Sequence, residues 1–173
     1  MAQHSKQRGL PLAVIDNTLL SRLVRLEVAQ FLPLLYKQIL IPPEVKREAY
    51  KAPHKGKQRL RKLLNEMAGF LVDCVEADEG VKLILKADLG EGEAAAIAQA
   101  DYRQTHLLID ETRGCKRAET MQLTVMRTAN LLNKLKEVGA IPKVKPYYDK
   151  LEKTGFYLEA KVRKQLLAEA GED

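Results

Sequence analysis

The 173-residue chain has no tryptophan, few aromatic residues (5%) and only two cysteines. Cys74 and Cys115 lie far apart and have no CxxC or CxxH neighbour, so neither a zinc site nor a redox pair is predicted, and we expect two buried or partly buried thiols. Nucleobases stack on exposed aromatic rings. Because such rings are scarce, stacking is not expected to supply much of any affinity for nucleic acid.

Long apolar segments are also missing. No run approaches the ~18 apolar residues that a membrane-spanning helix needs. The first residues, MAQHSKQRGLPLAVID, carry charge but neither the hydrophobic region nor the cleavage site of a signal peptide. We therefore expect a cytoplasmic protein without membrane contact. With 46% hydrophobic and 30% charged residues, the composition is typical of a globular protein, and one domain over residues 1–173 is expected.

Positive charge is concentrated in one segment. The net charge is +6, and residues 46–62 alone contain eight lysines or arginines against one acid, Glu48, so the rest of the chain is close to neutral. A charge run usually marks the solvated face of a surface helix. The concentration, with the interruptions at Pro53 and Gly56, instead favours a mobile clamp on a nucleic-acid backbone. The candidate contacts are Lys55, Lys57, Arg59, Arg61 and Lys62.

Apolar periodicity alternates short strands with helices. Continuous apolar runs typical of buried parallel strands occur at 11–16, 106–110 and 122–126 and at the start of QILIPPEV, whereas FLVDCVE and VKLIL are ambiguous. Helical spacing follows, for example at 18–26, 57–68 and 91–103. This alternation predicts an α/β fold with three layers, α/β/α, around a central parallel sheet of four to five strands.

Acidic residues follow the strands. Asp16 and Asp110 each come directly after a predicted strand, so the two should meet at the carboxyl edge of the sheet, where open sheets bind ligands. Either could instead only cap the following helix, which Asp often does. Glu111 adds a third acid. Glu93, in the first turn of a helix, and Glu48 are by default a helix-dipole residue and a solvent-facing charge.

Several carboxylates at one edge need a compensating charge, because like charges raise one another's pKa and destabilise the fold. A hard divalent cation such as Mg²⁺ or Mn²⁺ takes oxygen ligands and supplies that charge. A metal held in this way can activate water for attack on a phosphodiester. The basic side chains would then hold the substrate backbone, and those just behind Asp110 and Glu111 are further candidates: Arg113, Lys116 and Arg117.

Other readings of the motifs are weaker. Residues 90–95, GEGEAA, fit a dinucleotide fingerprint, but two glutamates would face the pyrophosphate and no first strand precedes them. Asp16-Asn17-Thr18 lacks the second Asp that a haloacid-dehalogenase-like phosphatase uses. The three histidines show no metal-ligand spacing.

The ordered motifs resemble the PIN domain, and within it an uncharacterised branch with a Gly-Glu-x-Glu-Ala helix and an Ile-Asp-Asp strand end. The resemblance extends over about residues 12–170. It rests on Asp16-Asn17-Thr18 after a strand, Glu48 after a double proline, LGEGEAAAIAQA, LLIDE, TANLL and the KEVGAIPKVKPYYDKLEKTGFYL segment.

The resemblance implies a metal-dependent endoribonuclease that cleaves RNA with Mg²⁺ or Mn²⁺. Family members often act as the toxin of a toxin-antitoxin pair and commonly dimerise, so an antitoxin protein and a homodimer are the expected partners. The residues that match the family's acidic set are Asp16, Glu48, Glu93 and Asp110, and Thr18 matches the polar residue that supports the first Asp. Glu111 stands where this branch more often has a second Asp. The alternative is a nucleic-acid- or partner-binding PIN-like module without catalysis.

Overall fold

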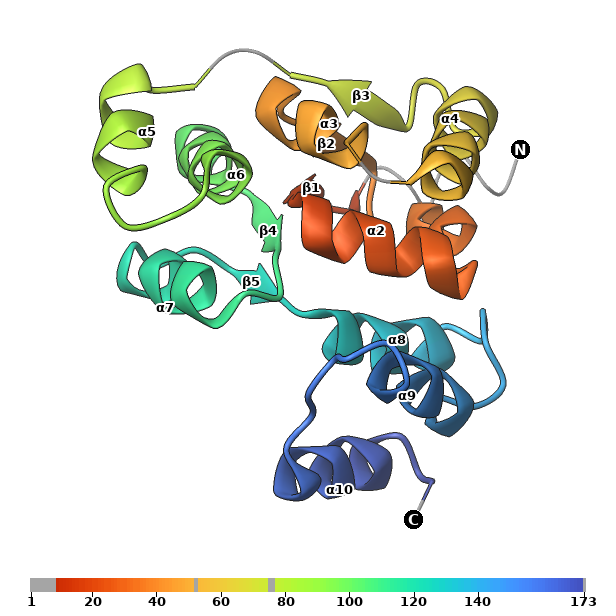
Figure 1. Ribbon diagram of the computed structural model, residues 1–173. Helices are drawn as coiled ribbons and strands as arrows, with labels where there is room; N and C mark the ends of the chain where they lie inside the picture. The colour runs from red at the N-terminus through yellow and green to blue at the C-terminus, as the bar shows by residue number, and fades with distance from the viewer. Residues whose placement is uncertain (1–8, 52, 75–76, 173) are drawn as a thin grey trace.

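The sheet is all-parallel and five-stranded. The computed structural model describes residues 9–51, 53–74 and 77–172, and Figure 1 shows the strands in the order β3-β2-β1-β4-β5 with helices packed around them. Val14 in the central strand is in register with Leu40 on one side and Leu107 on the other. The strands are β1 (Leu12–Ile15), β2 (Gln38–Ile41), β3 (Leu71–Asp73), β4 (His106–Leu108) and β5 (Val125–Met126). The predicted α/β/α fold is confirmed.

The helices form the outer layers. They are α2 (Asn17–Leu26), the 3₁₀ helix η2 (Ala29–Leu34), α3 (Pro43–Ala49), α4 (His54–Glu66), α5 (Glu79–Leu85), α6 (Glu91–Arg103), α7 (Thr112–Thr120), α8 (Thr128–Glu137), α9 (Lys145–Glu152) and α10 (Ala160–Glu169). The ambiguous VKLIL run lies in α5, where Asp78 caps the first turn through the amides of Gly80 and Val81. No helix in the described part of the chain is long and apolar enough to cross a membrane.

The strands are apolar because they lie inside the core. Ala13, Val14 and Ile15 of β1 are fully buried, because helices cover both faces of a central parallel strand. Helix α6 packs on the sheet with five buried alanines between Ala94 and Ala100, which let its backbone come close to β1 and β4. Cys74 and Cys115 are buried free thiols, as expected.

The basic segment is interrupted before Pro53, as expected, but not at Gly56. Pro53 precedes the first turn of α4, and Gly56 lies within that turn, so residues 54–66 form one continuous helix. Pro43 likewise begins α3, because proline has no N–H to lose at a helix start. The basic segment is thus two helices, α3 and α4, joined by a short connection.

The C-terminal end is fastened to α8 and α9. Glu172 accepts hydrogen bonds from the backbone N–H groups of Val144 at 2.7 Å and Lys145 at 3.1 Å, and it pairs with the Lys136 ammonium at 2.7 Å. These donors lower the pKa of Glu172 against the opposing effect of burial. In Figure 1 helix α10 accordingly lies below α8 and α9, away from the sheet.

Candidate active site

Asp16 follows β1 directly and is almost wholly buried (1% exposed). Its carboxylate caps α2 by accepting a hydrogen bond from the Leu19 N–H at 3.0 Å. Burial is the main reason that the pKa of Asp16 rises from 3.8 to about 7; the charges of Asp110 and Glu93 also raise it, whereas the amides of Leu19 and Thr18 lower it. A carboxylate in this position is strongly stabilised by any cation that comes near it.

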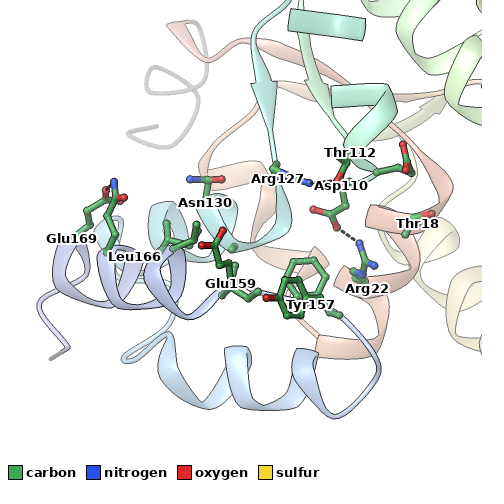
Figure 2. A pocket seen from close by; sticks show the side chains of 16 residues that line it. Thr18, Arg22, Asp110, Thr112, Arg127, Asn130, Tyr157, Glu159, Leu166 and Glu169 are labelled. Carbon is green, nitrogen blue, oxygen red and sulfur yellow. Dashed lines mark hydrogen bonds and ion pairs between the residues drawn. The ribbon is translucent and has the colours of Figure 1, made fainter. Parts of the chain in front are cut away.

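Asp110 lies just beyond β4 and is also buried. The Thr128 N–H donates to Oδ1 at 2.8 Å, while the Thr128 hydroxyl and the Arg22 guanidinium both donate to Oδ2. The guanidinium of Arg22 stacks on the ring of Phe156, 4.6 Å from its centroid. Figure 2 shows the ion pair of Arg22 and Asp110 at one side of a cavity. Arg22 therefore provides the positive charge that this buried carboxylate requires.

Glu48 is held against the start of α6. It is half-buried, and its Oε1 accepts a hydrogen bond from the Gly92 N–H at 2.8 Å, so it is not a solvent-facing helix charge. A Cβ atom on residue 92 would lie 2.5 Å from Oε2 of Glu48. Only glycine at position 92 thus allows the carboxylate of α3 to satisfy the free amide at the N-terminus of α6.

Glu93 and Glu111 complete the acidic group. Burial and then the charge of Glu111 raise the pKa of Glu93; Glu48 adds to this, while the Gly90 amide and Arg113 oppose it. Glu111 itself caps α7, accepting from the Gly114 N–H at 3.0 Å. Helix capping, the alternative role predicted for Asp16 and Asp110, is therefore confirmed for Asp16 but wrong for Asp110, because Glu111 caps the helix that follows.

These acids share one edge but are not grouped as ligands. Among residues 9–51, 53–74 and 77–172, no three His, Cys, Asp or Glu side chains are placed to hold a metal ion together. The reason is visible in their partners: Asp110 is turned to Arg22 and Thr128, and Glu48 to Gly92. The donor chemistry nevertheless fits a hard divalent cation, because it consists of carboxylate oxygens that repel one another.

A family model of the PIN domain (DUF3368) matches residues 12–172. The chain belongs to the PIN domain family. This establishes a nuclease-like module, a class that acts on nucleic acid and typically uses divalent metal ions. A search of curated proteins gave no match.

The predicted supporting and basic residues lie on different sides of this PIN domain. Thr18 is exposed, lines the cavity of Figure 2, and offers its amide toward Asp16. On α7, Arg113, Lys116 and Arg117 line a groove of about 340 Å³ together with Leu85 and Asp88, and Arg113 is close enough to Glu93 to lower its pKa. Helix α7 thus places positive charge beside the acids.

Helix α4 is placed differently. Its Arg59 lines a groove with Leu20, Val24 and Arg25 of α2, beyond the first turn of α2, which Asp16 caps. The other candidates of this helix are exposed or half-buried: Lys55, Lys57, Arg61 and Lys62. Of the two basic surfaces, that of α7 is therefore the one next to the acidic edge.

Sequence reasoning missed the residues that hold the acids. Arg22 lies mid-helix, 88 positions from Asp110, and looks like any polar-face arginine. Thr128 starts α8, and Arg127 beside it donates from its guanidinium to the Asp110 carbonyl at 2.7 Å. The one available signal was Gly92, since a glycine inside an Ala-rich helix suggests a close approach by another group.

Proposed function

We propose that this PIN domain is a metal-dependent endoribonuclease, in which Asp16, Glu48, Glu93 and Asp110, with Glu111 beside them, hold one Mg²⁺ or Mn²⁺ ion and RNA is the substrate. The observation that carries the proposal is the convergence of acids from α3, α6 and the ends of β1 and β4 on the carboxyl edge of one sheet. Such an arrangement costs stability unless it serves a ligand.

The repulsions connect all five acids. The charges of Asp110 and Glu93 raise the pKa of Asp16, and the charges of Glu111 and Glu48 raise the pKa of Glu93. A structural role would be served by one cap for each helix, without bringing the caps within reach of one another. The excess negative charge is therefore best explained by a cation that the folded chain is built to receive.

The chain's own residues divide the work. Asp16 and Glu93 have no basic side chain bonded to them among the described residues, and they offer the first oxygens to an ion. Arg22 must leave Asp110 before that carboxylate can bind the ion, and Thr128 continues to orient it. A divalent ion held there would supply Lewis-acid chemistry, polarising the scissile phosphodiester and lowering the pKa of a bound water.

RNA binding is assigned to the basic side chains that border the acids. Arg113, Lys116 and Arg117 on α7 are exposed and follow Glu111 within two turns, so a backbone held along α7 would pass over the acidic edge. Phosphate contacts of this kind position a strand without reading its sequence. The basic face of α4 would extend the track toward α2.

The test compares two glutamates of the same helix turn. Glu93→Gln removes a proposed ligand, whereas Glu91→Gln changes an exposed neighbour that pairs only with Lys86 among its described contacts. Purified wild-type protein and both variants are incubated with a mixed RNA in Mn²⁺ or Mg²⁺, with EDTA as a blank. Cleavage by the wild type and Glu91→Gln but not by Glu93→Gln supports the proposal. Equal cleavage by all three points to a contaminating nuclease.

The competing function is a nucleic-acid-binding module without catalysis. It is favoured by one observation: the Asp110 carboxylate has three donors and already has a positive partner in Arg22. RNA binding without cleavage in any divalent metal, together with no stabilisation by Mn²⁺, would decide for it. The antitoxin partner and the homodimer stay predictions of the family resemblance.

A further inference from the structure

A cavity of about 630 Å³ opens beside Asp110, between the sheet edge and the C-terminal segment. Its volume is within the range of about 300–1,000 Å³ that small-ligand sites occupy. In Figure 2, Asp110 and Arg127 lie across it from Tyr157 and Glu159, and Leu166 of α10 forms its far side. The cavity is therefore continuous with the proposed site of phosphodiester cleavage.

We propose that this cavity binds one unpaired nucleobase of the RNA substrate next to the scissile phosphate, with Tyr157 as the stacking surface and Glu159 as acceptor for an exocyclic amino group. The proposal rests on the endoribonuclease function proposed above and adds the part of the substrate that selects the cleavage position. It also differs from the expectation that aromatic residues are too scarce to matter, because a single well-placed ring is sufficient.

Tyr157 is the reason to expect stacking. Its side chain is 84% exposed, although it belongs to the large residues that normally lose water on folding. The neighbouring Phe156 is fixed by the guanidinium of Arg22, so the segment that carries Tyr157 is anchored at the mouth of the cavity. An exposed ring on an anchored segment can stack on a base without the entropic cost of first ordering that segment.

The charges of the cavity exclude the RNA backbone from it. Two arginines face four acids, namely Arg22, Arg127, Asp110, Glu111, Glu159 and Glu169. Without a bound ion, which is the state tested below, both arginines are engaged with Asp110, one at its side chain and one at its carbonyl. A second phosphate placed here would meet uncompensated negative charge. The backbone must therefore follow the basic α7 side, and the uncharged part of a nucleotide is what enters.

Polar groups on the wall match the edge of a base. Glu159 can accept from the amino group of cytosine or adenine, as carboxylates do in base recognition. The side-chain amide of Asn130 offers both a donor and an acceptor, as the edge of a base requires. An arginine side chain of a bound protein would need acceptors only. The geometry thus favours a base that carries an exocyclic amino group over uracil.

The experiment measures binding without cleavage. Fluorescence anisotropy in EDTA is recorded for oligoadenylate, oligocytidylate and oligouridylate of about eight nucleotides with wild type, Tyr157→Ala and Tyr157→Phe. The matched control is Tyr102→Ala, because Tyr102 is 55% exposed at the opposite end of α6. Tyr157→Ala should weaken oligoadenylate binding on the order of tenfold. Tyr157→Phe and Tyr102→Ala should bind like wild type, and the salt dependence should stay the same in all.

A second variant tests the amino-group contact. Glu159→Gln should reduce the preference for oligocytidylate and oligoadenylate over oligouridylate while leaving oligouridylate binding unchanged. Oligoadenylate binding that is equal in wild type, Tyr157→Ala and Glu159→Gln overturns the proposal.

Cleavage of the same RNAs in Mn²⁺ separates the two proposals. Binding that depends on Tyr157 without any cleavage keeps the nucleobase site and refutes the nuclease. Cleavage at the same positions and rates by wild type and Tyr157→Ala refutes the nucleobase site and keeps the nuclease.

Discussion

Replacing Arg22 tests the electrostatics of the acidic edge most directly. The Arg22 side chain is 25% exposed and that of its partner Asp110 only 1%, so Arg22→Gln leaves a buried carboxylate without its positive partner. Losing one partner of a fully buried pair costs about 3–5 kcal/mol. Thr128 still donates two hydrogen bonds and Arg22 is partly solvated, which reduces the expected loss to about 2–3 kcal/mol, or about 5–10 °C in melting temperature.

The same variant shows whether the Arg22–Asp110 ion pair is only structural or whether Arg22 occupies the position of a metal ion. If Arg22 occupies the position of a cation, Mn²⁺ binds Arg22→Gln more tightly, because no side chain has to be displaced from Asp110. Thermal unfolding is followed with and without Mn²⁺, with Arg25→Gln as control, since Arg25 is an exposed arginine on the same helix. The stabilisation by Mn²⁺ should be larger in Arg22→Gln than in the other two proteins. Equal or smaller stabilisation would falsify the competition between Arg22 and metal.

Three further predictions concern the acids, the glycine and the basic helices. Asp16 has a pKa of about 7 in the folded state and 3.8 ordinarily, so the folded state holds more protons between these values and stability falls as pH rises through them. Asp16→Asn, which keeps the cap, should therefore be more stable than wild type at pH 8 without metal and equal to it near pH 4, as urea unfolding would report. Gly92→Ala should cost about 1–3 kcal/mol by pushing Glu48 away, whereas Gly90→Ala, with no atom within 4 Å of its Cβ, should cost less than about 1 kcal/mol in the same assay. Neutralising Arg113, Lys116 and Arg117 should flatten the dependence of RNA affinity on salt more than neutralising Lys55, Lys57, Arg59 and Arg61. A wild-type slope in the first variant and a flattened slope in the second would place the RNA on α4 instead.

The fold and the positions of the acids could be predicted because both depend on short-range signals. A buried parallel strand is apolar throughout, and Asp16 and Asp110 follow such strands at once, so chain order alone puts them at one edge. The double proline likewise predicts the start of α3, because proline is tolerated in the first turn of a helix.

The partners of the acids could not be predicted, because they depend on the packing of distant segments. Arg22 reaches Asp110 only because α2 lies beside the end of β4, and no pattern within either segment records that contact. The supposed break at Gly56 failed for a related reason. A glycine in the first turn of a helix costs little, so its breaking tendency was overridden by the amphipathic pattern that follows it in α4.

The wall formed by residues 156–169 contributes no strand to the sheet and none of the five acids of the proposed metal site. If the cavity binds a nucleobase as proposed, substitutions there would change which nucleotide is accepted while the carboxylates and the helices they cap stay as they are. Under the two proposals, selectivity and chemistry lie in separate stretches of the chain, and each could diverge without changing the other.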